Sequence, residues 1–313
     1  MDNALLKTSP TAIERSPGLK DLLNSFIMAQ DVKPNSKALY RRTLKQFFNW
    51  IDKEGYNLTE LTRPDIIRYK EDLLSSGMSG LTVGSYITSV RKFYEWAEAN
   101  KYYPNIARGI KTPKRKQQFR KQPLSPDQSQ ELLRYFMSRD KRDYAIVNLL
   151  LRTGLRTIEV ARANIGDIAY KGGKRILYVH GKGRDEKDNF VILTDKAYSP
   201  IEDYLGLRGR VKPGDPLFIS ISNNSRGDRL TTRTISKIAK EGLQAIGLSG
   251  RDFTAHSLRH STAVNILRAG GSIEDAQGVL RHSSPATTQI YTATIKEEMR
   301  LKNAPEELLD RLY

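Results

Sequence analysis

The sequence predicts a mostly helical fold with a small antiparallel β-sheet in the second of two domains. Apolar residues recur at three- and four-residue spacing through about the first 105 residues. A basic stretch interrupts this pattern, and three strand-like runs separated by glycine-containing turns follow before helical spacing returns. The 313 residues leave room for two domains of roughly 150 residues each.

Composition excludes several classes of protein. Hydrophobic residues make up 38% of the chain, which is enough for packed cores and excludes wholesale disorder. No apolar run reaches about 18 residues, so we expect no membrane-spanning helix and no membrane partner. The absence of cysteine excludes disulfides, a thiol nucleophile and a thiolate zinc site. The start of the chain has no signal-peptide pattern, and we expect a cytoplasmic protein.

The charge balance gives the first indication of a partner. Lysine and arginine total 52 against 35 aspartates and glutamates, for a formal net charge of +17. Such an excess favours a polyanionic partner, most often nucleic acid. The alternative is a protein that is merely basic.

Residues 19–110 are expected to form a helical domain after a loose lead at residues 1–18. The first helix begins at Leu19, where apolar residues start to recur on one face. Ser36 is a candidate cap for the second helix, and Gly55 is expected to end it.

Two further helices complete the predicted first domain. Thr62 precedes an arginine, a proline and Asp65, which is the pattern of a capped helix start. This third helix is expected to run to about Ser75. The fourth is expected to span roughly residues 82–99.

The stretch at residues 111–122 has six basic residues and no acidic ones, and we interpret it as a linker. It is either simply solvated or a strap that crosses a phosphate backbone. We favour the strap, because basic segments lie on both sides of it. Its expected DNA contacts are Lys114, Arg115 and Lys116.

Residues 123–313 form the predicted second domain. Ser125 is expected to cap its first helix, with proline at the first helical position. A second helix is expected at about residues 142–153, where Gly154 ends it. The three strand-like runs, separated by glycine-containing turns, are residues 165–170, 175–180 and 189–193.

The end of the chain carries a short amphipathic pattern. Residues 305–307 resemble a helix start, and an apolar stripe of Leu308, Leu309 and Leu312 follows. A helix this short does not hold alone in water, so the tail is expected to dock on its own domain or on a neighbouring subunit.

Three of the four histidines lie close together in the sequence. His256 and His260 are four residues apart, which puts them on one helix face as in some zinc sites. The general-base glutamate of such sites is absent, and the cationic Arg259 lies between them. We therefore favour structural or catalytic histidines over metal ligands.

Four short motifs with candidate catalytic residues are best interpreted together. They are TGLRTIEV at residues 153–160, the GKG hairpin at residues 181–183, HSLRH at residues 256–260, and LRH at residues 280–282 followed by Tyr291. In order and spacing these segments resemble the tyrosine recombinase family of integrases and Xer-type enzymes. The resemblance implies a helical, SAM-like core-binding domain ahead of an α+β catalytic domain.

The resemblance also implies roles for individual residues. In this family two arginines hold the scissile phosphate, a hairpin lysine protonates the leaving group, two histidines support the chemistry and a tyrosine is the nucleophile. The matching residues are Arg156 and Arg259, Lys182, His256 and His282, and Tyr291. A family acid that supports the site matches Glu159, and His260 is expected to pack or to buttress the site.

The implied roles agree with the chemistry of phosphodiester exchange. Two guanidinium groups can neutralise the charge on the nonbridging oxygens, so no metal or other cofactor is expected. Cationic neighbours favour the phenolate of a tyrosine, whose ordinary pKa is ~10. A phosphotyrosine conserves the energy of the ester, so rejoining needs no ATP.

Two features depart from the family pattern. The family often has glycine where Arg281 stands, which puts the local geometry there in doubt. The hairpin is longer and more acidic than usual, with Asn189 at a position that is commonly basic. Lys182 remains the preferred hairpin lysine, and Arg184 and Lys187 are possible substitutes.

The sequence thus predicts a site-specific recombinase that exchanges strands through a 3′-phosphotyrosine and a Holliday junction. The expected partners are double-stranded DNA and three further copies of the chain, which together form a homotetramer on two sites. The unusual hairpin and Arg281 favour a mobile element, and no arm-binding domain is recognised, which favours simple sites. The alternatives are Xer-type dimer resolution, a type IB topoisomerase and a catalytically inactive DNA-binding regulator.

Replacing Lys182 with alanine is expected to slow strand cleavage by about 10²–10⁴-fold, the usual scale for losing a general acid. A substrate with sulfur at the 5′ bridging position has a leaving group that needs no proton, and it should restore the rate. Single-turnover cleavage of both substrates by both proteins measures this. If the sulfur substrate does not restore cleavage, Lys182 is not the acid.

Overall fold

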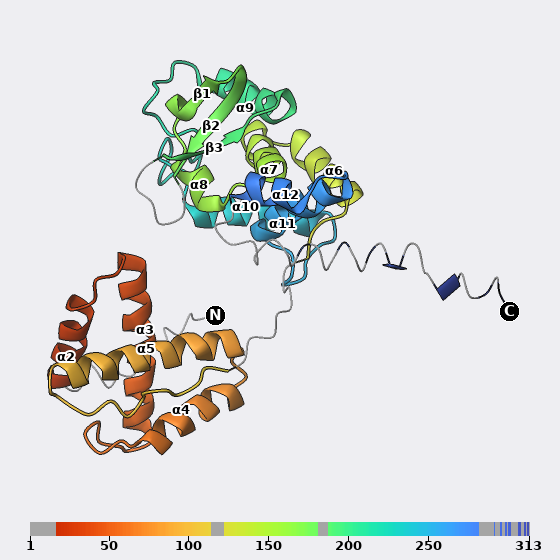
Figure 1. Ribbon diagram of the computed structural model, residues 1–313. Coiled ribbons are helices and arrows are strands. Elements are labelled where there is room, and N and C mark those ends of the chain that lie inside the picture. The colour runs from red at the N-terminus through yellow and green to blue at the C-terminus, as the bar shows by residue number, and fades with distance from the viewer. Residues whose placement is uncertain are drawn as a thin grey trace, which may run out of the picture. The chain divides into compact units, whose positions relative to one another are not determined.

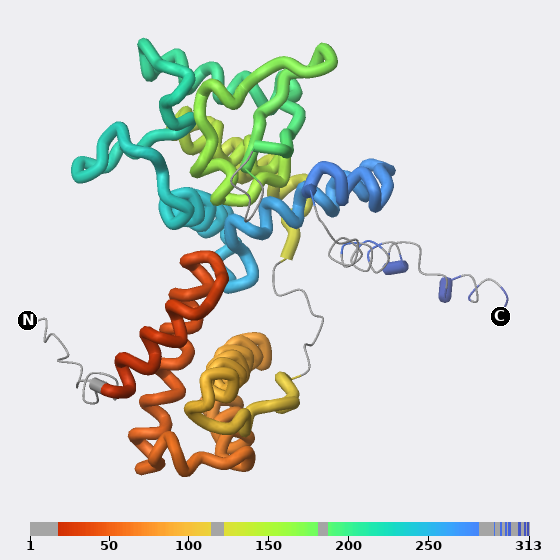
Figure 2. The backbone as a smooth tube through the Cα atoms, turned by 60° about the vertical axis from the view of Figure 1, so that its left-hand side comes forward, coloured from red at the N-terminus to blue at the C-terminus, as the bar shows by residue number. Residues whose placement is uncertain are grey.

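The computed structural model describes residues 17–113, 122–180 and 187–281, together with a few positions nearer the C-terminus. The chain divides into two compact units between Gln117 and Gln118, and each is considered by itself (Figures 1 and 2). The described elements are mostly helices, with one three-stranded antiparallel sheet in the second unit. This confirms the predicted fold class. None of the described helices is long and apolar enough to cross a membrane.

The first unit consists of four described helices around an aromatic core. Helix α5 runs across α3 (Figure 1), and the buried Thr43 hydroxyl donates to the Ser89 hydroxyl at 2.7 Å where they meet. Phe26 and Phe93 pack edge to face with ring centroids 5.7 Å apart. The helices are α2 (Pro17–Met28), α3 (Pro34–Lys53), α4 (Arg63–Ser75) and α5 (Gly80–Ala99).

The caps show where sequence signals were sufficient. At the start of α4, the Asp65 carboxylate accepts the Thr62 backbone N–H at 2.8 Å, which confirms the predicted cap. The predicted Ser36 cap is wrong, because α3 already begins at Pro34. Ser36 instead lies in the first turn, where its backbone N–H donates to the Lys33 carbonyl. Proline at a first helical position was the stronger signal.

The second unit surrounds a larger core with helices and a small sheet. Its first helix begins as predicted, with the Ser125 hydroxyl accepting the Gln128 backbone N–H at 3.1 Å. The elements before and within the sheet are α6 (Pro126–Met137), α7 (Lys141–Thr153), α8 (Thr157–Arg162), η1 (Ile165–Asp167), β1 (Ile168–Lys171), β2 (Lys174–Val179) and β3 (Asn189–Ile192). The helices after it are α9 (Asp195–Arg208), α10 (Thr232–Ala245), α11 (Ala255–Arg268) and α12 (Ile273–Leu280).

The sheet has the order β1–β2–β3, with Leu177 of β2 paired to Ile168 on one side and to Val191 on the other. The first predicted strand was too long at its start. The Asn164 backbone N–H donates to the Asp167 carboxylate at 2.8 Å, which caps a short 3₁₀ turn before β1 begins.

Helices α7, α11 and α12 converge at Gly154. This residue ends α7 as predicted, in the left-handed conformation with φ of 59°. A Cβ built there would lie 2.4 Å from a methyl carbon of Leu280 at the end of α12 and 3.4 Å from Thr262 on α11. Helices α11 and α12 lie side by side in both views (Figures 1 and 2). Glycine is thus required both for the turn and for the close approach of the helix ends.

Some predicted features fall outside the described residues. They include the linker contacts Lys114, Arg115 and Lys116, and most of the tail, including Leu308 and Leu309. The domain boundaries drawn from the sequence and the DNA strap both stay predictions.

Replacing Gly154 with alanine is expected to destabilise the protein in two ways. The left-handed backbone disfavours a side chain by about 1–2 kcal/mol, and forcing a methyl group against Leu280 costs about 1–3 kcal/mol more. Gly172→Ala is the matched control, because Gly172 has φ of 56° with no atom within 4 Å of its added Cβ. Urea unfolding measures the difference. Equal losses in the two variants would show that the helix ends do not meet at Gly154.

Candidate active site

Arg156 is held by an acid on its own helix. It stands two residues after Gly154 and caps α8, and Glu159 on that helix is 1% exposed. The Glu159 carboxylate accepts the Arg156 backbone N–H at 2.7 Å and its guanidinium Nη1 at 2.9 Å. A carboxylate that binds both ends of one residue fixes the direction of its side chain.

Arg259 joins two helix ends. It lies on α11 and is 2% exposed. Its Nη1 donates to the Gly154 carbonyl at the end of α7, and its Nη2 donates to the Leu280 carbonyl at the end of α12 at 2.5 Å. These bonds use two of the five N–H donors of a guanidinium, so the group retains donors for an anion.

The arginines form one electrostatic cluster with the predicted nucleophile. Burial and, to a smaller extent, the charge of Arg156 lower the pKa of Arg259 to about 9, and Glu159 opposes this shift. Arg281 and Tyr291 also contribute, so all four side chains lie within electrostatic reach of Arg259. Arg259 remains charged at neutral pH.

The predicted nucleophile contacts a histidine. The Nδ1 atom of His260 lies 2.8 Å from the hydroxyl of Tyr291, and these two side chains are 4% and 3% exposed. The His256 ring packs against the His260 ring at 4.6 Å with an interplanar angle of 84°, and His256 is exposed. The three rings form a row from the surface to the buried hydroxyl. Sequence reasoning expected His260 to pack or to buttress the site and did not predict its contact with Tyr291, although its spacing from His256 had already put both histidines on one helix face.

The environment of Tyr291 differs from the sequence expectation. Arginine neighbours were expected to favour its phenolate, and Arg259 and Arg156 do lower its pKa. Burial has the larger effect, and it raises the pKa of Tyr291 to about 12. The hydroxyl is therefore protonated at neutral pH, and its attack requires a proton acceptor.

Part of the β2–β3 hairpin and the segment that contains His282 lie outside the described chain. Lys182, Arg184 and His282 lie outside it, so their roles stay predictions. Lys187, the other possible substitute for Lys182, forms an ion pair with the buried carboxylate of Asp167 on η1. This pairing anchors the returning arm of the hairpin and argues against Lys187 as the acid.

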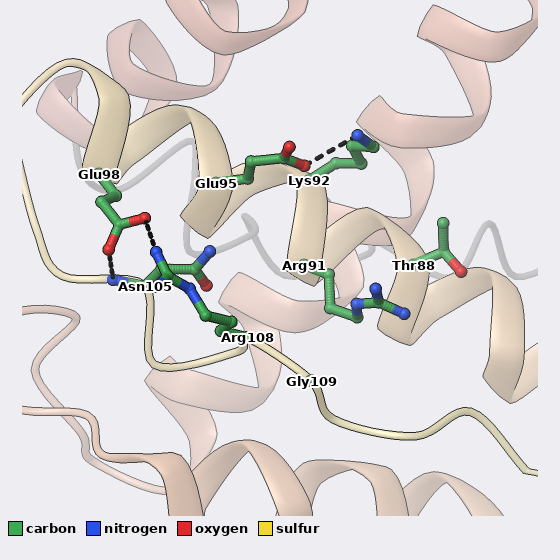
Figure 3. Close-up of a pocket in the computed structure, with 8 residues that line it drawn as sticks. All are labelled: Thr88, Arg91, Lys92, Glu95, Glu98, Asn105, Arg108 and Gly109. Atoms are coloured by element: carbon green, nitrogen blue, oxygen red, sulfur yellow. Dashed lines mark hydrogen bonds and ion pairs between the residues drawn. The ribbon is translucent and has the colours of Figure 1, made fainter.

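The structure also has a surface pocket to which the second unit contributes no residue. It has a volume of about 490 Å³ and lies in the first unit, beside α5 (Figure 3). Lys92 pairs with Glu95 at 2.8 Å and Arg108 pairs with Glu98 at 2.5 Å on its walls. Its charges are thus largely balanced, and Figure 3 shows no convergent set of catalytic groups. Within the described chain, no three histidine or carboxylate side chains are grouped to hold a metal ion.

Comparison with known protein families decides the classification. The profile described as "Phage integrase family" matches residues 122–298, and the one described as "Phage integrase, N-terminal SAM-like domain" matches residues 19–101. The chain belongs to the phage integrase family of tyrosine recombinases. The resemblance stated from the sequence motifs is confirmed.

Relatives of this phage integrase family member match along most of their length. The tyrosine recombinase XerC of Pelobacter propionicus is 31% identical over 269 residues, which cover 84% of this chain and 86% of the relative. The tyrosine recombinase XerD of Listeria monocytogenes is 29% identical over 306 residues, covering 94% and 98% of the two chains.

Solved structures of the phage integrase family share the fold. The XerH site-specific recombinase bound to a palindromic difH substrate, in a post-cleavage complex, matches with a TM-score of 0.74 and 20% identity, covering 92% of this chain and 84% of that one. A lambda integrase dimer bound to a COC′ core site matches with a TM-score of 0.68 and 18% identity, covering 87% and 76%.

Tyr291 is expected to stay protonated at pH values where an ordinary tyrosine, with a pKa of ~10, ionises. The reason is burial, which raises its pKa to about 12 against the attraction of two arginines. Carbon-13 NMR of tyrosine Cζ between about pH 8 and about pH 11 measures this, with Tyr291→Phe to assign the resonance. Ionisation of Tyr291 at or below pH ~10 would show that the arginines outweigh burial.

Proposed function

We propose that this protein is a site-specific DNA recombinase that breaks and rejoins strands through a 3′-phosphotyrosine intermediate. The observation that carries the proposal is the contact between His260 and the Tyr291 hydroxyl beside the charges of Arg156 and Arg259. A nucleophile, a proton acceptor and two phosphate-binding groups thereby meet at one place. Membership in the tyrosine recombinase family supports the same chemistry.

In the proposed reaction, the guanidinium groups of Arg156 and Arg259 bind the nonbridging oxygens of the scissile phosphate. Negative charge on these oxygens increases in the transition state, so prepositioned cations stabilise that state more than the ground state. Glu159 orients one arginine and two helix-end carbonyls orient the other. Little reorganisation is then needed when the phosphate enters.

The nucleophilic step moves one proton and exchanges one bond. The Tyr291 oxygen bonds to phosphorus while the bond from phosphorus to the 5′ oxygen breaks. When Nε2 of His260 carries the ring proton, Nδ1 accepts the phenolic proton at the observed 2.8 Å. A proton for the 5′ oxygen is assigned to Lys182 from the family resemblance. Reversal of these steps by another 5′ hydroxyl rejoins the strand without ATP.

Two further histidines, the exposed His256 and His282, which lies outside the described residues, complete the proposed catalytic residues. His256 lies in the first turn of α11, where it can donate to a phosphate oxygen while its ring supports His260. We assign it to phosphate binding rather than to proton removal from Tyr291, since His260 makes that contact. The role of His282 is carried over from the family resemblance alone.

We further propose that four copies exchange strands between two sites through a Holliday junction. The formal charge of +17 suits a protein that encloses DNA, and the linker residues Lys114, Arg115 and Lys116 would cross its backbone. The DNA-bound XerH and lambda integrase structures with this fold are consistent with this partner. A type IB topoisomerase would share the chemistry but would relax DNA without joining two sites.

Two biological roles have separate support. The long acidic hairpin and Arg281 depart from the common family pattern, and they favour the strand exchange of a mobile element. The names of the XerC and XerD relatives, which match over most of their length, favour resolution of chromosome or plasmid dimers. The sequence of the recombination site separates these roles.

The wild-type protein is expected to form a covalent complex with DNA, and Tyr291→Phe is expected to form none. The substitution removes only the attacking oxygen, whereas phosphate contacts dominate affinity, so binding should persist. The substrates are fragments of the source genome that carry nicks. A nick next to the attacked phosphate lets the 5′ end of the cleaved strand diffuse away, which traps the covalent complex. Denaturing gels detect the complexes, and sequencing of the trapped DNA maps the site.

The outcomes of this experiment separate the proposals. A covalent band that persists in Tyr291→Phe would move the nucleophile to another tyrosine. Trapped sequences at the ends of an element favour a mobile-element integrase, and one chromosomal site favours dimer resolution. Cleavage should continue in EDTA, and a requirement for a divalent metal would contradict the two-arginine mechanism. Recombination between two copies of the mapped site, absent for a topoisomerase, completes the test.

A further inference from the structure

Arg281 occupies a backbone conformation that favours glycine. It follows α12 as its C-cap, with φ of 54° and ψ of 48°. Among the described residues, only Lys101 and Arg281 combine a side chain with positive φ. A residue with a Cβ is disfavoured in this region, so the Arg281 side chain must contribute something that glycine would not.

The Arg281 guanidinium turns inward instead of extending into solvent. Its side chain is 10% exposed, and its Nη2 lies 2.9 Å from Oε2 of Glu159. Its Nη1 donates to the Val279 carbonyl at 2.8 Å, which satisfies an unpaired acceptor in the last turn of α12. The side chain therefore fastens the end of α12 to the buried acid on α8.

The Glu159 carboxylate is divided between two arginines. Its Oε1 binds the Arg156 guanidinium, and its Oε2 binds both the Arg156 backbone N–H and Arg281. These three contacts fix the plane of the carboxylate, which in turn fixes the Arg156 guanidinium. Without Arg281, Oε2 would keep only the backbone contact.

Arg281 also changes the charge of the cluster. Glu159 is 1% exposed and supplies one negative charge against the three positive charges of Arg156, Arg259 and Arg281. With glycine at position 281, the same acid would neutralise half of the remaining positive charge. Arg281 therefore lets Glu159 orient Arg156 without cancelling the field that a phosphate meets.

We propose that Arg281 is a positioning residue that holds Glu159, and through it Arg156, in the orientation that binds the scissile phosphate. The role of Arg281 in phosphate binding rests on the proposed function. Its effect on the orientation of Glu159 and Arg156 is a property of the protein without DNA. The guanidinium of Arg281 acts through Glu159 and does not touch the DNA.

The first test measures positioning without DNA. Nitrogen-15 NMR of arginine side chains in the full-length protein reports how fast each guanidinium reorients. Arg281→Gly removes the guanidinium and relieves the backbone, so we expect an intact fold in which the Arg156 signals show faster motion. Lys101→Gly is the matched control, because it relieves the same backbone conformation in the first unit. Unchanged Arg156 motion in Arg281→Gly would overturn the inference.

The second test measures the consequence for cleavage on the mapped site. Arg281→Gly is expected to lower the single-turnover rate at saturating protein by about 10–100-fold, the scale for losing a group that orients an active-site residue. The affinity for DNA should change by less than about twofold, because one buried guanidinium contributes little to the phosphate contacts that dominate binding. Arg281→Lys keeps the charge but replaces the planar guanidinium with a single ammonium group, and it should restore part of the rate.

A double-mutant cycle with Glu159→Gln separates positioning from direct contact. If Arg281 acts through Glu159, the double variant should cleave no more slowly than Glu159→Gln alone. Multiplied losses would instead show that Arg281 contacts the phosphate, which overturns the proposal. If the wild type forms no covalent complex, the proposed function fails, and the NMR comparison still decides whether Arg281 positions Arg156.

Discussion

The buried carboxylate of Glu159 is the constraint on which the rest of the site depends. A carboxylate that is 1% exposed must be paired, and here it is paired to two arginines from distant segments of the second unit. Arg156 is the N-cap of α8, and Arg281 is the C-cap of α12. Arg281 contacts Glu159 although it lies 122 residues later in the sequence. One acid thus ties Arg156, which is proposed to bind the phosphate, to the segment that precedes Tyr291 in the sequence. Breaking either pair would leave the buried carboxylate with a single arginine partner, so its orientation depends on all three residues.

The helix ends provide the second level of organisation. The last carbonyls of α7 and α12 have no partners within their helices, and Arg259 binds one from each. This places the positive guanidinium where two helix dipoles present negative ends, which compensates for its burial. The contact is possible because Gly154 lets Leu280 approach more closely than any side chain would allow. Local backbone requirements, the binding of helix-end carbonyls and the proposed phosphate binding therefore depend on the same few residues.

Local signals in the sequence predicted much of the fold, and contacts between distant segments explain what they missed. The Thr62 and Ser125 caps and the turn at Gly154 depend on neighbouring residues, so their patterns were sufficient. The motifs around Arg156 and Arg259 likewise identified residues that the structure brings together. No periodicity could show that His260, and not His256, contacts Tyr291, because that depends on segments 31 residues apart. The pKa of Tyr291 depends on burial, which the sequence does not report.

The raised pKa of Tyr291 restricts how this residue could act as the proposed nucleophile. With a pKa of about 12, the phenolate fraction at neutral pH is only about 10⁻⁵. A bound phosphate would lower the phenolate fraction further, because the negative charge of the phosphate offsets the two arginines that favour the phenolate in the free protein. Prior ionisation of Tyr291 is therefore the less favourable route. Transfer of the proton to Nδ1 of His260 as the new bond to phosphorus forms avoids a free phenolate, and the 2.8 Å contact already provides the required geometry. The same burial that suppresses the free phenolate thus favours the proposed route, in which the proton leaves Tyr291 while the new bond to phosphorus forms.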